Sequence, residues 1–359
     1  PGVKSQQVLY RSTDATNQPV AISGTVLVPT SPWMGLGKRP LVSWGVGTRG
    51  VGDQCAPSYT LSEGVDYEGL FIKALLDRGW AVAVTDYQGL GTPGGHTYMV
   101  GKAQGRAVLD MARAALKLPG TGLDATTPIG IAGYSQGGAS AGWAAELEAT
   151  YAPELNVKGV AAGGVPADLL AVAQSLDGGA FLAFALLAAF GYDSAYPELD
   201  LPSYLNDTGT QLYADASSLC LVDVDGFGQF LGTAFHRMSD YTATNPLDDA
   251  TWQNRLNANK LGSTKPSVPV YQYHGLIDEI IPFAQAKDLR IDYRWCGRVA
   301  LTRDFLPHLH EPEPGLLVDI GCMGRGVGLQ TAMGKAMAQY LSTGDRASLP
   351  FPVTSITPL

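Results

Sequence analysis

One serine in this sequence stands in a setting typical of a catalytic nucleophile. Ser135 is the centre of a Gly-Tyr-Ser-Gln-Gly motif at residues 133–137, which follows the apolar run 128–132 and precedes a run compatible with a helix. Glycines on both sides permit a tight turn that raises the serine hydroxyl at the carboxyl edge of a sheet, beside a helix N-terminus. A chance match is the alternative, since the chain holds 44 glycines. The order of strand, turn and helix favours the nucleophile.

A serine hydroxyl needs a base to become nucleophilic at neutral pH, and the base needs an orienting carboxylate. In hydrolases with this motif the chain order is serine, acid, histidine. Asp278 is the first well-placed acid after Ser135, because it follows the strand-like run 268–273. We expect its neighbour Glu279 to point elsewhere and His274 to help hold the loop. The sequence therefore predicts Asp278 as the acid.

The histidines after this acid are His308 and His310, and one of them is expected to be the base. Side chains two residues apart share a side in extended chain, so the spacing alone leaves both open. His96 and His236 precede the acid, and we interpret them as surface or structural residues.

Acyl transfer also needs backbone N–H groups that bind the developing oxyanion. The amide after the nucleophile belongs to Gln136, and the glycine-rich segment 44–50 after a predicted strand is the natural source of a second donor. Within that segment we predict Thr48, with an ordinary glycine turn as the alternative. Segment 86–91 is expected to shape the wall of the site, because it lacks the Gly-Lys-Ser/Thr of a nucleotide-binding loop.

The elements that must position these residues alternate between strand and helix. A hairpin opens the chain, and short apolar runs typical of strands buried on both faces follow, with helical patterns between them. We expect strands at 7–10, 20–28, 40–44, 80–85, 128–132, 157–161, 268–273 and 298–302, and helices at 70–78, 104–118, 137–151 and 328–341. This alternation predicts βαβ crossovers and a mostly parallel, doubly wound sheet, an α/β-hydrolase fold.

The alternation breaks between residues 167 and 261, where helical, Ala/Leu-rich and loop-like pieces replace strands. We expect a catalytic core formed by residues 1–166 and 262–359, with 167–261 inserted as a largely helical cap. The apolar run 179–191 in this cap is shorter than the ~20 residues that cross a bilayer. It either lines an acyl tunnel or forms a buried cap helix.

The four cysteines Cys55, Cys220, Cys296 and Cys322 lie far apart, without the Cys-x-x-Cys pairs of zinc or redox sites. An even count with this spacing suits two disulfides and an oxidising compartment, and three pairings are possible. The shorter loop favours Cys296 with Cys322, which leaves Cys55 with Cys220; free buried thiols are the alternative. No basic region followed by an apolar run opens the sequence, so we expect a signal peptide to be either absent or already removed.

Composition narrows the class of protein. Hydrophobic residues make up 45% and charged residues 16% of the chain, which predicts a globular protein with a large core. The net charge of -9, from 24 Lys and Arg against 33 Asp and Glu, argues against nucleic acid as a partner. Phosphate binding requires basic clusters, and none is visible in the sequence.

Several stretches together resemble the secretory lipases of fungi and actinobacteria, the family typified by Candida antarctica lipase A. They are residues 53–58 (Asp-Gln-Cys-Ala-Pro-Ser), 85–92 (Thr-Asp-Tyr-Gln-Gly-Leu-Gly-Thr), 133–137, 151–155 (Tyr-Ala-Pro-Glu-Leu) and 278–282 (Asp-Glu-Ile-Ile-Pro). They span most of the chain in the expected order. The resemblance implies an α/β-hydrolase core under a largely helical cap, two disulfides, export from the cell, and hydrolysis of carboxylic esters up to long-chain triacylglycerols.

The resemblance also bears on the base. In the family the histidine follows a lead of the type aromatic-x-Pro and is preceded by an acidic residue. Here residues 305–307, Phe-Leu-Pro, supply the lead, and counting from Pro307 favours His310, with Leu309 where the acid is expected. Segment 312–326 is longer than the family pattern implies.

The combined hypothesis is a secreted serine ester hydrolase that acts through an acyl-enzyme on Ser135. A serine peptidase of the same fold would use the same three residues, and a catalytically silent binding protein is the other alternative. We expect a small-molecule or lipid ester as substrate, at most a transient contact with a lipid interface, no obligate protein partner, and neither a cofactor nor a metal.

Overall fold

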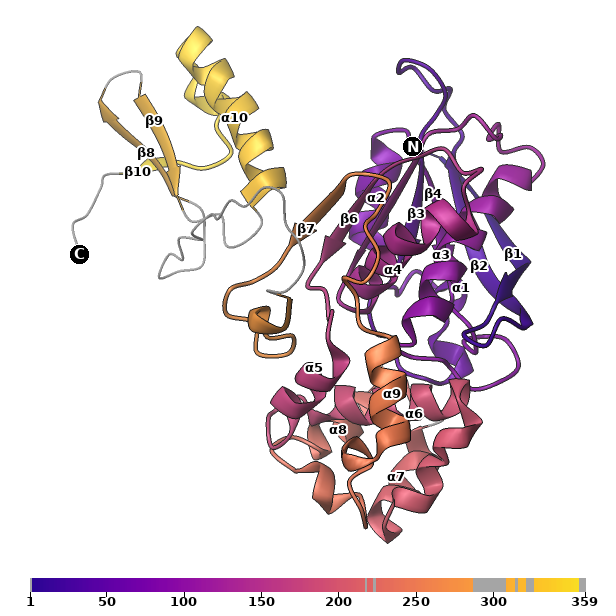
Figure 1. Cartoon of the computed structure of the whole chain (residues 1–359). Coiled ribbons are helices and arrows are strands. Elements are labelled where there is room, and N and C mark those ends of the chain that lie inside the picture. Colours follow the sequence, from indigo (N-terminus) through magenta and orange to yellow (C-terminus); the bar gives the residue numbers. More distant parts are fainter. Residues whose placement is uncertain are drawn as a thin grey trace. The chain divides into compact units, whose positions relative to one another are not determined.

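The chain forms two compact units, Pro1–Arg290 and Ile291–Leu359. The structure is a computed structural model that describes residues 2–216, 218–221, 224–286, 308–313, 316–320 and 326–354. Figure 1 identifies the elements of both units along the chain.

A seven-stranded sheet is the centre of the N-terminal unit, with the strand order β1-β2-β4-β3-β5-β6-β7. Its strands are β1 (Val3–Thr13), β2 (Pro19–Pro29), β3 (Leu41–Gly45), β4 (Ala81–Thr85), β5 (Ile129–Tyr134), β6 (Val157–Gly163) and β7 (Val270–Tyr273). The opening hairpin is antiparallel and joins β4 antiparallel, whereas β4, β3, β5, β6 and β7 run parallel. This is the predicted, mostly parallel α/β sheet.

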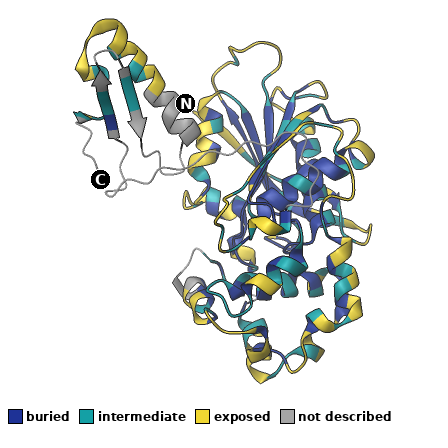
Figure 2. Cartoon of the chain, turned by 60° about the vertical axis from the view of Figure 1, so that its left-hand side comes forward, coloured by how far each residue is buried: buried dark blue, intermediate teal, exposed yellow. Residues whose placement is uncertain are grey.

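The apolar runs of the sequence become strands buried on both faces. Every residue of β4, Ala-Val-Ala-Val-Thr, is buried, which explains why this run shows no polar alternation. Figure 2 shows the inner strands coloured as buried along most of their length, while the covering helices carry exposed outer faces.

Four helices accompany this sheet: α1 (Pro57–Ser62), α2 (Gly69–Asp77), α3 (Gly101–Lys117) and α4 (Gln136–Tyr151). Helices α3 and α4 pack against each other and over the parallel strands, while α1 and α2 pack over β2 and β4. Helix α3 is fastened by polar contacts as well, because Tyr10 and Ser43 donate hydrogen bonds to the carbonyls of Ala107 and Val108.

Between β6 and β7 the described part of the chain has helices and no strand. These are α5 (Leu169–Leu176), α6 (Leu182–Ala195), α7 (Asp207–Ala216), α8 (Val224–Gly232) and α9 (Ala250–Ala258), gathered at one end of the sheet in Figure 1. They surround a hydrophobic core separate from that of the sheet, in which Trp252 is buried and donates to the carbonyl of Leu199 at 3.1 Å. Because the stretch has its own core, we keep residues 167–261 as a proposed cap.

Short 3-10 helices complete the described elements: η1 (Asp53–Cys55), η2 (Pro197–Leu199), η3 (Leu201–Tyr204), η4 (Met238–Asp240), η5 (Pro246–Asp248), η6 (Phe283–Ala286) and η7 (Arg346–Ser348). Among all described helices, none combines the length and the hydropathy that a membrane span requires.

A disulfide ties the helical stretch to the sheet. Cys55 in η1 bonds Cys220 over a sequence separation of 165 residues, the pairing that loop length left for these two cysteines. Backbone hydrogen bonds flank it: Leu221 donates to Arg49 at 2.8 Å, and Val51 donates to Leu219 at 3.3 Å. Cys296 and Cys322 lie outside the described residues.

The C-terminal unit contains β8 (His308–Glu313), β9 (Leu316–Ile320), α10 (Gly326–Thr343) and β10 (Val353–Thr354). Strand β8 pairs antiparallel with β9 and parallel with β10. Helix α10 agrees with the predicted helix 328–341. Strand β8 was not predicted, because His-Leu-His-Glu-Pro-Glu holds four polar residues and a proline beside Leu309, which is fully buried. The predicted strand 298–302 lies outside the described residues.

The disulfide yields a prediction about stability. Replacing both Cys55 and Cys220 with alanine should lower the free energy of unfolding by about 2–5 kcal/mol, because the bond closes a long loop and so restricts the unfolded chain. Urea unfolding of the oxidised proteins measures this difference. An unchanged unfolding midpoint in the double variant would show that the backbone bonds of residues 49–51 hold this junction alone.

Candidate active site

The turn around Ser135 has the backbone strain of a nucleophile elbow. Ser135 connects β5 to α4 with φ 58° and ψ -118°, a combination that a residue with a side chain rarely adopts. Its amide donates to the carbonyl of Gly163 in β6 at 3.0 Å. The predicted order of strand, turn and helix is therefore present, with the serine half-buried at the carboxyl end of β5.

The glycines of the motif are needed for close approach. A Cβ on Gly137 would lie 2.0 Å from the carbonyl oxygen of Gly45, and one on Gly133 would lie 2.4 Å from that of Gly137. Both distances are far below van der Waals contact, and backbone atoms cannot rotate away as a side chain can. The turn therefore packs directly against the end of β3, where the predicted second oxyanion donor follows.

The two predicted oxyanion donors lie in these adjoining segments. Gln136 is the first residue of α4, one of the positions whose amides have no partner within the helix. Thr48 is buried, its hydroxyl lies 2.7 Å from the Tyr98 hydroxyl, and its carbonyl accepts from Tyr67 at 3.0 Å. The amide of Gly47 is already used, because it donates to Glu68.

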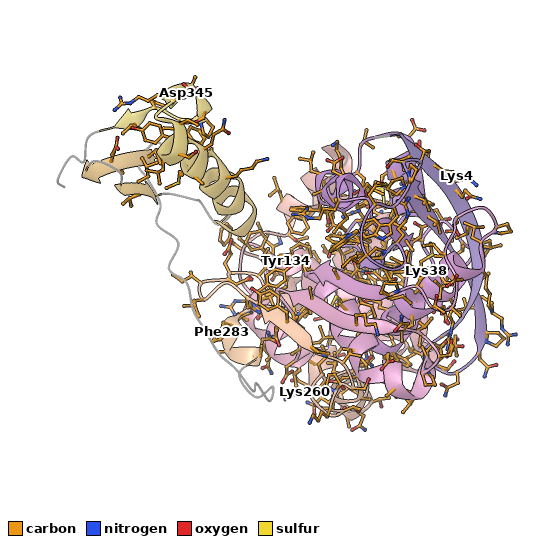
Figure 3. All side chains as sticks on the ribbon, turned by 90° about the horizontal axis from the view of Figure 1, so that it is seen from above. Lys4, Lys38, Tyr134, Lys260, Phe283 and Asp345 are labelled. Atoms are coloured by element: carbon orange, nitrogen blue, oxygen red, sulfur yellow. A yellow bond between two sulfur atoms is a disulfide. The ribbon has the colours of Figure 1, made fainter. Side chains whose placement is uncertain are left out.

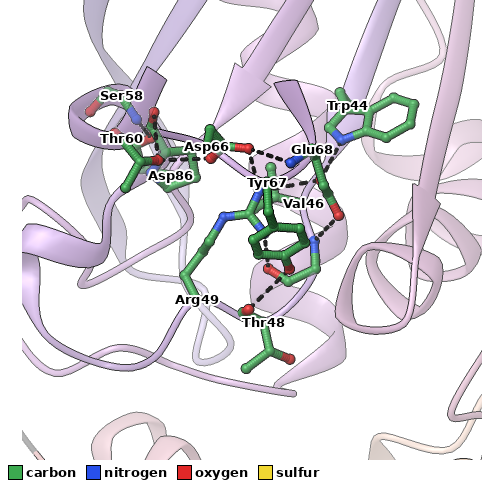
Figure 4. Close-up of polar contacts among 12 residues, drawn as sticks. Trp44, Val46, Thr48, Arg49, Ser58, Thr60, Asp66, Tyr67, Glu68 and Asp86 are labelled. Carbon is green, nitrogen blue, oxygen red and sulfur yellow. Dashed lines mark hydrogen bonds and ion pairs between the residues drawn. The ribbon is translucent and has the colours of Figure 1, made fainter. Parts of the chain in front are cut away.

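Buried charges hold segment 44–50 in place (Figure 4). Glu68 accepts from the Trp44 indole at 2.8 Å and from the Gly47 amide at 3.0 Å, so one carboxylate fixes both ends of the turn. Arg49, with 1% of its side chain exposed, pairs with Asp66 at 2.9 Å and with Glu68 at 3.4 Å. Its guanidinium also lies 3.8 Å from the centre of the Tyr67 ring. These contacts fix the backbone of the segment.

The acid loop after β7 folds around the carboxylate of Asp278. One oxygen accepts from the amides of Ile280 at 3.1 Å and Ile281 at 2.8 Å, and the other lies 3.5 Å from Nε2 of His274. That His274 nitrogen lies 2.7 Å from the carbonyl of Ile281, which can only accept, so the nitrogen carries a proton. His274 thus holds the loop, as its position before the acid suggested.

The acid loop lies near the nucleophile turn. Burial, together with the carboxylates of Asp278 and Glu279, raises the pKa of Tyr134, the residue before Ser135. Rings from the two strands also meet, since the centres of Tyr134 and Tyr273 are 6.0 Å apart. Figure 3 draws the described side chains on the ribbon and labels Tyr134. The parallel order β5-β6-β7 brings these carboxyl ends to one edge.

The candidate bases lie in the C-terminal unit. His308 and His310 belong to β8, where His310 pairs in register with Val318 of β9 and Thr354 of β10. Ser135 and Asp278 lie in the N-terminal unit. The placement of either histidine beside the serine therefore stays a prediction.

The two remaining histidines have structural partners. Nδ1 of His236 lies 2.8 Å from the Tyr241 hydroxyl in the helical stretch. His96 is buried, and its Nε2 lies 3.2 Å from the side-chain nitrogen of Gln136, beside the nucleophile. This contact could not be predicted from the sequence, because a histidine in a glycine-rich loop has no periodicity that reports burial.

An apolar pocket opens at Ser135. Ser135 and Gln136 line it together with Ile280 and Ile281 of the acid loop, and the remaining wall comes mainly from helices α5, α6 and α9. Helix α6 contributes Phe184, Ala185, Ala188, Ala189 and Tyr192 to the wall, while its Leu182, Leu186 and Phe190 are buried in the hydrophobic core of the helices. The apolar run of the sequence thus serves both purposes, pocket wall and core helix.

A metal site needs several His, Cys, Asp or Glu side chains close together. Within the ranges that the structure describes, no three His, Cys, Asp or Glu side chains are grouped so that they could hold a metal ion.

Comparison with known proteins shows to which family this chain belongs. A model of the secretory lipase family matches residues 56–311. The secreted triacylglycerol lipase LIP5 of Malassezia furfur is 32% identical over 287 residues, 76% of this chain and 72% of that protein. A protein of Mycobacterium tuberculosis named as a probable inactive lipase is also 32% identical, over 84% of this chain and 66% of its own length.

The solved structures agree on the fold. The closed state of Candida antarctica lipase A superposes with a TM-score of 0.68 and 26% identity, over 79% of this chain and 68% of that one. The matched residues include both the nucleophile turn and the acid loop. The chain therefore has an α/β-hydrolase fold, belongs to the secretory lipase family, and is a carboxylic ester hydrolase.

Proposed function

We propose that this protein is an exported serine hydrolase that cleaves fatty-acyl esters through an acyl-enzyme on Ser135. The observation that carries the proposal is the strained serine at the opening of an apolar pocket. Pockets of this kind bind a ligand by removing apolar surface from water, and a few polar groups orient it. An acyl chain in the pocket would place its ester carbonyl at Ser135.

In this mechanism the Ser135 hydroxyl attacks the ester carbonyl while His310 takes its proton. The amides of Gln136 and Thr48 stabilise the oxyanion, and Asp278 stabilises the imidazolium. His310 then gives the proton to the departing alcohol. Water, activated by the same histidine, attacks the acyl-enzyme and releases the carboxylic acid and the free serine.

The composition of the pocket favours an ester over a peptide. None of the described residues that line it carries a charge. A peptidase that recognises a peptide amine needs a carboxylate where the amine binds, because an unpaired ammonium group is costly to desolvate. Export is supported by the Cys55–Cys220 disulfide, since such bonds persist in oxidising compartments, and by relatives that are named as secreted.

The nucleophile is tested by Ser135→Ala. Turnover of p-nitrophenyl butyrate should fall by at least about 10³-fold, because the acyl-enzyme can no longer form. Labelling of the wild type by a fluorophosphonate, absent in the variant, separates an active hydrolase from a silent binding protein. Retained turnover in a variant with unchanged circular dichroism would contradict the proposed nucleophile.

The base is tested by comparing His310→Ala with His308→Ala. We expect kcat to fall by about 10³-fold or more in the first and to change little in the second, because only one histidine can accept the Ser135 proton. Steady-state kinetics on the same ester measure both. The reverse result would move the base to His308 and leave the serine mechanism intact.

The acyl pocket is tested by Ala188→Phe on α6. The larger ring should fill part of the pocket and lower kcat/KM for a dodecanoate ester by about tenfold relative to a butyrate ester. Ala258→Phe, at an exposed position of α9 outside the pocket lining, is the matched control. An equal loss on both chain lengths in Ala188→Phe would contradict this binding mode.

A further inference from the structure

The segment after β4 connects the two parts of the proposed oxyanion hole. Tyr87, His96 and Tyr98 form a row of rings, with centres 6.2 Å apart for the first pair and 6.0 Å for the second. The Tyr87 hydroxyl donates to the carbonyl of Val46, and the Tyr98 hydroxyl lies 2.7 Å from that of Thr48. These two contacts reach the segment that holds one donor.

The middle ring, His96, contacts the residue that carries the other donor. Nε2 of His96 lies 3.2 Å from the side-chain nitrogen of Gln136, and both residues are 2% exposed. The carbonyl of Gln136 is held at the same time, because Ser140 donates to it at 2.8 Å. The first residue of α4 is therefore fixed both at its side chain and at its backbone.

The hydrogen bonds of His96 define its protonation. Nδ1 lies 2.8 Å from the carbonyl of Gln88, which only accepts, so Nδ1 carries the proton. Burial lowers the pKa of His96 to about 4, so the ring is neutral near pH 7 and its Nε2 is an acceptor. Gln136 accordingly donates to His96. With both nitrogens engaged, this histidine is not available as a base for Ser135.

We infer that His96 is a positioning residue for ester hydrolysis, which aligns the Gln136 amide with the oxyanion by holding the Gln136 side chain. The inference rests on the proposed function, since it requires an oxyanion at Ser135. Donors in such a site act only when they are aimed at the oxyanion beforehand, so a small rotation of the first turn of α4 weakens the transition state more than the bound ester.

Two substitutions separate this role from a structural one. His96→Asn keeps a donor near the position of Nδ1 for Gln88 but removes the acceptor for Gln136. His96→Gln places an amide oxygen near the position of Nε2 and so restores that acceptor. We expect kcat for a butyrate ester to fall about tenfold or more in His96→Asn, with KM within about twofold of wild type, and to recover in His96→Gln.

A trifluoromethyl ketone forms a hemiketal adduct with the serine, and this adduct carries the oxyanion. Its binding therefore reports on the same donors. Its affinity should weaken in His96→Asn by the same factor as kcat. Gln136→Leu, which keeps the backbone amide, should reproduce the loss of kcat and of inhibitor affinity. The double variant His96→Asn/Gln136→Leu should have the same kcat as the less active of the two single variants. His236→Phe, which removes another histidine whose ring packs against a tyrosine, should leave both values unchanged.

Each outcome decides a separate claim. Normal kcat in His96→Asn, additive losses in the double variant, or a rise in KM alone would overturn the positioning role. If His96→Asn does not fold, the Gln136→Leu variant decides the question by itself, since normal kcat and inhibitor affinity there would also overturn it. If Ser135→Ala keeps wild-type turnover, the proposed function fails, and the role of His96 fails with it.

Discussion

The close approach between the nucleophile turn and the ends of its neighbouring strands is the constraint on which the site depends. Ser135 has a backbone conformation that costs about 1–3 kcal/mol, and its surroundings must hold it there. Two neighbouring strands hold it there. The carbonyl of Gly163 in β6 accepts a hydrogen bond from the Ser135 amide, and Gly45 of β3 packs against the backbone of Gly137. Both contacts require β5 to lie between β3 and β6, so the order of the sheet sets the geometry of the serine.

The same contact places segment 44–50 beside the helix that begins at Gln136. Beyond Gly45, the last residue of β3, this segment belongs to no helix or strand, and buried contacts of Glu68 and Arg49 hold it instead. Removing one member of a buried ion pair typically costs 3–5 kcal/mol, because its partner is left without compensation. A segment fixed in this way can hold an amide in place before the substrate arrives, which is what an oxyanion donor requires.

The helices after β6 make the pocket beside Ser135 apolar. Their hydrophobic core is separate from that of the sheet, and the pocket wall is the face of α5, α6 and α9 turned toward Ser135. The Cys55–Cys220 bond and the backbone contacts beside it join these helices to the end of segment 44–50. The surface that is proposed to bind the acyl group and the segment that is proposed to bind the oxyanion are thus joined by a disulfide.

The sequence alone determined the fold class and the turn at Ser135, because both are recorded locally. Apolar runs such as Ala-Val-Ala-Val-Thr report strands buried on two faces, and the glycines around Ser135 report a turn that larger residues cannot make. The His96–Gln136 contact, the ion pairs of Arg49 and the two-sided role of α6 were decided by the tertiary structure. The first two join residues that are distant along the chain, and α6 faces both the pocket and the hydrophobic core of the helices. Sequence periodicity therefore reports none of them. Strand β8 is the same case, since its pairing with β9 and β10 overrides a polar sequence that has no strand pattern.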